Sequence, residues 1–199
     1  MKFYAGIDLA KRSSQVKIIT ADRKTVEELK IENSPQAFER VFRKYKGDIA
    51  VACEACSNAF WVADALAPIV GSIQVGHPTK IRWIAEARIK TDKIDAGILA
   101  ELLRADLFPS IAIPPRRIRD LRELARGLIR MRRQSTRVRN QVHGLLGRQG
   151  IPYKRSEVTG PKLAKLVQDV ELPKPARVAA ESLLRVENGI LEEHKKLQT

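Results

Sequence analysis

Apolar and polar residues alternate, or form short continuous apolar runs, at five places in the first half of the chain. Three of these stretches follow one another closely, which is typical of a meander of antiparallel strands. The fourth is apolar throughout, as expected for a central strand that is covered on both faces. The pattern predicts strands at residues 3–8, 14–20, 25–32, 49–53 and 72–76.

Helical spacing of apolar residues fills the gaps after the third strand. Ser34 followed by Pro35 is a helix start, because it combines a capping side chain with a proline at the first position. Three antiparallel strands, followed by two strands that are reached through helical crossovers, predict an α/β fold. We expect a ribonuclease H-like (RuvC-like) mixed five-stranded sheet with flanking helices. The expected helices run over about 35–45, over 58–67, from about 78 onward, and over 92–106 with Thr91 as the cap.

Three prolines, Pro109, Pro114 and Pro115, interrupt these patterns and predict a boundary. We expect an α/β domain at residues 1–108 and an α-helical region at residues 109–199.

Beyond the prolines, apolar residues recur every three or four positions and predict a helix over 115–149, about 50 Å long. Its apolar seam is narrow, which favours an antiparallel hairpin or coiled coil over a globular core helix. This seam predicts self-association as a dimer or higher homo-oligomer. A last helix is expected over 173–197, broken or weakened at Gly189. The seam consists of Leu121, Ala125, Leu128, Met131, Ser135, Val138, Val142 and Leu145.

Positive charge is concentrated in one segment. The formal net charge is +14, and residues 116–155 hold thirteen basic residues, twelve of them arginine, against Asp120 and Glu123. Arginine forms bidentate contacts with phosphate, so the segment favours contact with an RNA or DNA backbone. A solvated coiled-coil exterior is the alternative. Aromatic residues make up only 5% of the chain, so shape recognition of structured RNA is favoured over base stacking. The expected contact residues are Arg116, Arg117, Arg119, Arg122, Arg126, Arg130, Arg132, Arg133, Arg137 and Arg139.

The two cysteines form a single pair, Cys53 and Cys56. One such pair supplies only half of a zinc site, so we expect small apolar residues in a reducing compartment. The start of the chain reaches Asp8 before a signal-peptide core could form, and no later stretch is long and apolar enough for a membrane span. The expected localisation is the cytoplasm of a prokaryote.

Four carboxylates lie where they could meet. Asp8 ends the first predicted strand and Glu54 ends the fourth, whereas Asp92 and Asp95 are three apart and would share one face of a helix. Each acid could also have a purely structural role: Asp8 could cap a turn, and Glu54 could lie in a surface loop. Asp92 and Asp95 could be acids in the first turn of a helix. Together they would be costly without a cation, and carboxylate oxygens suit Mg²⁺ or Mn²⁺, with two ions expected.

Basic residues surround these acids in the sequence. Lys11 follows Asp8, and Arg88, Lys90 and Lys93 flank Asp92. They could hold phosphates near the metal ions, although solvated surface charge is the ordinary reading of each one.

The segments Gly6–Lys11, Cys53–Cys56 and Lys90–Ala96 resemble the motifs of the DEDD transposases of the one-ten insertion-sequence family. This group includes the pilin-gene invertase Piv and the bridge-RNA-guided recombinases. The resemblance implies a RuvC-like catalytic and Mg²⁺ site at Asp8, Glu54, Asp92 and Asp95. It also implies transposition and DNA recombination, with donor and target DNA ends and a guide or bridge RNA as partners.

The chain departs from the family pattern in two respects. Family members carry a carboxy-terminal transposase domain with a serine nucleophile; we expect that domain to be absent here, leaving a fragment incomplete for strand exchange. His77-Pro78 replaces the more usual Asn-Pro. The alternatives are a Holliday-junction resolvase or ribonuclease H-like nuclease, and a non-enzymatic RNA-binding adaptor. A sugar-kinase-like phosphotransferase is a further alternative, but it needs glycine-rich phosphate loops, and the sequence has no such cluster.

Overall fold

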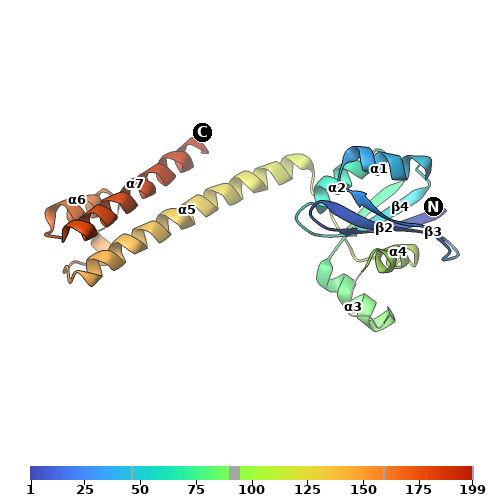
Figure 1. The fold of residues 1–199 in the computed structure, drawn as a ribbon, viewed down its shortest axis with the longest axis horizontal. Helices are drawn as coiled ribbons and strands as arrows, with labels where there is room; N and C mark the ends of the chain where they lie inside the picture. The colour runs from blue at the N-terminus through green and yellow to red at the C-terminus, as the bar shows by residue number, and fades with distance from the viewer. Residues whose placement is uncertain (46, 90–94, 159, 199) are drawn as a thin grey trace. The chain divides into compact units, whose positions relative to one another are not determined.

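A six-stranded mixed sheet forms the centre of the first part of the chain (Figure 1). The computed structural model describes residues 1–45, 47–89, 95–158 and 160–198. The strand order is β3-β2-β1-β4-β5-β6, with β1 parallel to β4, β4 parallel to β5, and the remaining pairs antiparallel. The strands are β1 (Phe3–Leu9), β2 (Ser13–Thr20), β3 (Thr25–Glu32), β4 (Ile49–Glu54), β5 (Ser72–Gly76) and β6 (Ser110–Ile111).

The five predicted strands are confirmed, and the mixed sheet with flanking helices is compatible with the ribonuclease H-like fold. The expected number of strands was wrong by one. The two-residue strand β6 is too short to carry a periodic pattern, and it is defined by its pairing with Val75 and Gly76.

Helices cover both faces of this sheet (Figure 1). On one face, α1 (Pro35–Phe42) and α2 (Ala59–Leu66) bury the main apolar core against the strands. The Ser34 side chain accepts a hydrogen bond from the Ala37 amide, so the predicted cap is confirmed; a 3-10 turn at Arg43–Tyr45 follows α1. The other face carries α4 (Ala96–Arg104), which packs on β1, β2 and β4.

The start of α4 differs from the prediction. The helix begins at Ala96 rather than at Asp92, and its N-cap is Asp95 rather than Thr91. Before it, α3 spans Pro78–Ile89. Both Thr91 and Asp95 are suitable capping residues, and the backbone of Asp95 is extended, as an N-cap requires.

The chain divides into two compact units, Met1–Ile113 and Pro114–Thr199. The division follows β6, whereas the sequence predicted a boundary near Pro109. The second unit contains α5 (Arg116–Arg148), α6 (Pro161–Asp169) and α7 (Lys174–Lys196), with a short 3-10 turn at Arg155–Glu157.

The helical unit has its own core, in which α7 packs along the second half of α5. Val142 and Leu146 of α5 meet Leu163 and Val167 of α6 and Ala180 of α7. The predicted break at Gly189 was wrong, since α7 continues through it. The hairpin of α5 with α7 uses only the end of the predicted seam, and Leu121 at its start is 53% exposed, so a coiled coil is not established.

No helix in the described ranges is both long and apolar enough to span a membrane.

Candidate active site

Asp8 and Glu54 lie side by side at the carboxyl ends of two neighbouring central strands. Parallel strands β1 and β4 pair as far as Ile7 opposite Cys53, and each acid is the next residue along its strand. Neighbouring strands are about 4.8 Å apart. Ile7 and Cys53 are both buried in the core beneath α1 and α2, so the alternation of the strands directs Asp8 and Glu54 to the face that carries α4. Asp8 is exposed and Glu54 half-buried.

A glycine brings α4 onto β1. A side-chain carbon at Gly6 would overlap the carbonyl oxygen of Ala96 and lie 2.7 Å from the amide nitrogen of Ala100. The first turn of α4 therefore rests directly on β1, two residues before Asp8. Glycine is rare inside strands except where another backbone approaches closely, and that signal was available in the sequence.

Asp95 is the residue before Ala96, so it stands at the amino-terminal end of α4. One of its carboxylate oxygens accepts a hydrogen bond from the Ile98 amide at 3.0 Å. The expectation that Asp92 and Asp95 share a helix face was wrong for Asp95, because it is a cap in extended conformation. Asp92, Lys90 and Lys93 lie outside the described residues.

The turn after β1 is held from two sides. The Ala10 carbonyl oxygen accepts hydrogen bonds from the side-chain amides of Asn33, at 2.7 Å, and Asn58, at 3.1 Å. The backbone amide of Asn33 also donates to the Arg12 carbonyl. Exposed Lys11 therefore follows Asp8 on a fixed turn. Sequence reasoning did not identify the two asparagines, because their partners are 23 and 48 residues away.

Carboxylates that end adjacent strands fit a hard divalent cation, which prefers oxygen ligands. Asp8 and Glu54 supply such oxygens from β1 and β4, and Asp95 lies at the neighbouring helix start. Within residues 1–45, 47–89, 95–158 and 160–198, no group of three or more histidine, cysteine or acidic side chains is close enough to form a complete metal site.

The two cysteines play different parts in the fold. Cys53 is buried in the core, and burial raises the pKa of its thiol to about 12. Cys56 is exposed, and its thiol donates to the Asn58 side chain at 3.0 Å. Both are free thiols.

The basic helix α5 presents most of its arginines to solvent. Arg119 and Arg139 are half-buried, and Arg119 donates to the Pro114 carbonyl. Arg130 pairs with Glu123 on the helix surface. The exposed members of the predicted set are Arg116, Arg117, Arg122, Arg126, Arg130, Arg132, Arg133 and Arg137.

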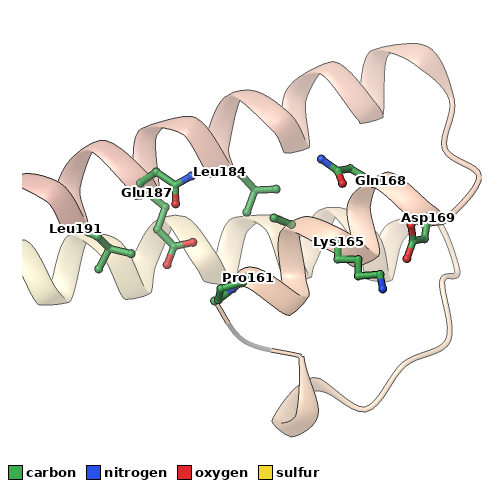
Figure 2. Close-up of a pocket in the computed structure, with 10 residues that line it drawn as sticks. Pro161, Lys165, Gln168, Asp169, Leu184, Glu187 and Leu191 are labelled. Carbon is green, nitrogen blue, oxygen red and sulfur yellow. The ribbon is translucent and has the colours of Figure 1, made fainter.

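Arg139 has a structural partner. Its side chain donates to Glu187 of α7 at 2.8 Å, and the Ser135 hydroxyl donates to the same carboxylate oxygen at 3.1 Å. Glu187 is 3% exposed and lies at the wall of an open cavity of about 570 Å³ between α6 and α7 (Figure 2). Pro161 and Lys165 of α6 line it opposite Leu184 and Leu191 of α7. The carboxylate is used in folding the helical unit, so this cavity is not the candidate active site.

A sheet compatible with the ribonuclease H-like fold, with acids at the ends of two neighbouring strands, is the framework of a class of nucleic-acid enzymes. Comparison with protein families identifies the group. The family model of DEDD transposases of the IS110 type, described as transposase, matches residues 5–150. The chain therefore belongs to this DEDD transposase family, and the match extends from β1 to just beyond α5. No curated protein matches the chain.

Proposed function

We propose that this chain is the catalytic and nucleic-acid-binding part of a DNA transposase, with Asp8, Glu54, Asp92 and Asp95 as its active site. One observation carries the proposal: Asp8 and Glu54 end neighbouring parallel strands on the face covered by α4. Asp95 caps that helix, and Gly6 allows the helix to rest on β1 beside Asp8.

The four carboxylates would hold Mg²⁺ or Mn²⁺, two ions in all. When bound, such ions stabilise the attacking and leaving oxygens of a phosphodiester exchange. Asp8 and Glu54 contribute oxygens from rigid strands, which keeps them in position. Asp95 uses one oxygen to cap α4, and its other oxygen forms no hydrogen bond with a described residue. Electrostatic repulsion among the four carboxylates favours cation binding.

The α5 arginines would bind nucleic acid, both the DNA ends and a guide RNA. Eight exposed guanidinium groups along one helix suit phosphate contacts. Exposed apolar residues between them support self-association through the same helix, since Leu121 and Ile129 are 53% and 52% exposed. A second copy of the chain would cover them.

Metal binding tests the proposal. Titration calorimetry with Mn²⁺ on the full chain compares the wild type with Asp8→Asn and Glu54→Gln. Each substitution removes one anionic ligand and is expected to lower Mn²⁺ affinity roughly tenfold or more, about 1.4 kcal/mol per factor of ten. Asp106→Asn is the matched control, because Asp106 is an exposed acid beyond the opposite end of α4. Equal affinity in all four proteins would rule out the site.

Substrate preference then distinguishes the activities. Metal-dependent processing of DNA carrying element ends supports the transposase. Preferential cutting of four-way junctions would identify a resolvase, and RNA binding without metal binding would identify an adaptor.

A further inference from the structure

One row of side chains crosses the first three strands from Asp8. The register pairs Asp8 of β1 with Gln15 of β2, and Gln15 with Lys30 of β3. Residues opposite one another on neighbouring strands project from the same face. The three side chains therefore form a continuous row from the proposed active site to the edge strand β3.

The next row of paired residues shows from which face of the sheet Asp8, Gln15 and Lys30 project. Ile7, Val16 and Leu29 are paired in the same way, and all three belong to the core beneath α1 and α2. Because side chains alternate along a strand, the Asp8–Gln15–Lys30 row projects from the opposite face, the one that carries α4.

All three residues of this row are exposed, whereas Gly6 and Lys17 of the next row on the same face are buried and half-buried. In that other row Gly6 lies against α4, and Lys17 is neutralised by Glu28 at 3.0 Å. Asp8, Gln15 and Lys30 are all exposed. Within the described residues, Lys30 forms no ion pair and the Gln15 side chain forms no hydrogen bond. Lys17 of β2 and Lys30 of β3 are the basic residues that these two strands place on this face. Because Lys17 is in an ion pair, Lys30 is the one that is available to bind an anion.

The length of the row matches a nucleic-acid strand. Two strand spacings separate Asp8 from Lys30, about 10 Å. One strand of a duplex carries a phosphate about every 3.4 Å along its axis, so the row extends over about three phosphates. The carboxylates at one end repel a polyanion, and a cation at the other end offsets that repulsion.

We propose that Gln15 and Lys30 bind the DNA strand that carries the scissile phosphate, on the side of β2 and β3. Lys30 pairs with a phosphate displaced from the reacting one, and the Gln15 amide, which can both donate and accept, hydrogen-bonds the intervening nucleotide. This inference rests on the proposed function, because it takes Asp8 as the reacting end of the row.

The test measures binding of fluorescein-labelled single-stranded DNA to the full chain over a range of salt concentrations. Lys30→Ala is expected to weaken binding roughly three- to tenfold at low salt and to reduce the salt slope by about 0.7, the value for one lost phosphate contact on a single strand. Lys30→Arg retains the charge and is expected to bind as the wild type does. Gln15→Glu adds a second anion beside Asp8 and is expected to weaken binding.

Lys24→Ala is the matched control, since Lys24 is an exposed lysine at the opposite end of the β2–β3 hairpin. A Lys30→Ala protein that binds DNA as Lys24→Ala does would overturn the inference, and so would a loss confined to RNA of the same sequence. Mn²⁺ titration separates this outcome from failure of the active site. Unchanged Mn²⁺ affinity in Asp8→Asn would refute the proposed function, whereas intact Mn²⁺ binding with an unaltered salt slope refutes only the role of Lys30.

Discussion

Gly6 of β1 lies so close to Ala96 of α4 that no side chain fits between them. The contact joins the strand that ends in Asp8 to the helix that is capped by Asp95. It therefore controls both the packing of α4 on the sheet and the separation of two proposed metal ligands.

Gly6→Ala is expected to destabilise the first unit by about 1–3 kcal/mol, because the added methyl group must displace α4. Urea unfolding followed by tryptophan fluorescence measures this unit alone, since Trp61 and Trp83 both belong to it. Gly127→Ala is the control: nothing lies near Gly127 in α5, and the change is expected to stabilise that helix by about 0.5–1 kcal/mol in circular dichroism. A Gly6→Ala protein that unfolds like the wild type would contradict the close packing.

Asp95 is expected to have two separable roles. Asp95→Ala removes the capping bond to Ile98 and should cost about 1 kcal/mol of stability as well as Mn²⁺ affinity. Asp95→Asn keeps an effective cap but removes the charge, so it should lower Mn²⁺ affinity with little change in stability. Calorimetric titration and urea unfolding measure the two effects.

Ser34→Ala is the control for Asp95, because Ser34 caps α1 and lies in no proposed metal site. It should lose a similar stability and keep full Mn²⁺ affinity. Full affinity in Asp95→Asn would show that Asp95 is a helix cap alone.

The sheet could be predicted from the sequence because its strands carry their own patterns. The apolar run of β4 and the alternation in β2 each specify a strand without reference to the rest of the chain. By contrast, β6 exists only through its pairing with β5, and the nine-residue helix α6 gains its stability from packing against α5 and α7. The strand β6 has no local signal, and α6 has only a short one, a proline at its first position followed by buried Leu163 and Val167.

The proposed active site could likewise be predicted only in part. Asp8 and Glu54 could be brought together by reasoning alone, because adjacent parallel strands end at the same edge of a sheet. The cap of α4 was misassigned because Thr91 and Asp95, two suitable capping residues, lie within five positions of each other, and the structure shows that Asp95 forms the capping hydrogen bond to Ile98. The role of Arg139 could not be predicted either, because Glu187 is 48 residues away.

Arg139 and Glu187 are expected to stabilise the helical unit. Glu187→Ala leaves the half-buried Arg139 and the buried Ser135 hydroxyl without their acceptor, which should cost about 3 kcal/mol, the lower end of the range for a broken buried pair. Glu123→Ala breaks the exposed pair with Arg130 and should cost less than about 1 kcal/mol. Thermal unfolding by circular dichroism measures both. Equal stability of the two variants would mean that the buried pair contributes no more to this unit than the exposed pair does.

The exposed arginines in the middle of α5 are expected to determine the salt dependence of nucleic-acid binding. Neutralising Arg130, Arg132, Arg133 and Arg137 together removes up to four phosphate contacts, which should reduce the slope of log affinity against log salt by about 3. The matched control neutralises four exposed lysines of α6 and α7, Lys162, Lys165, Lys174 and Lys195. Both proteins lose the same charge, so a general electrostatic effect would lower the two slopes equally. A larger loss in the arginine variant, measured by fluorescence anisotropy with structured RNA and with duplex DNA, assigns the contacts to α5. Equal losses would mean that net charge alone attracts the nucleic acid.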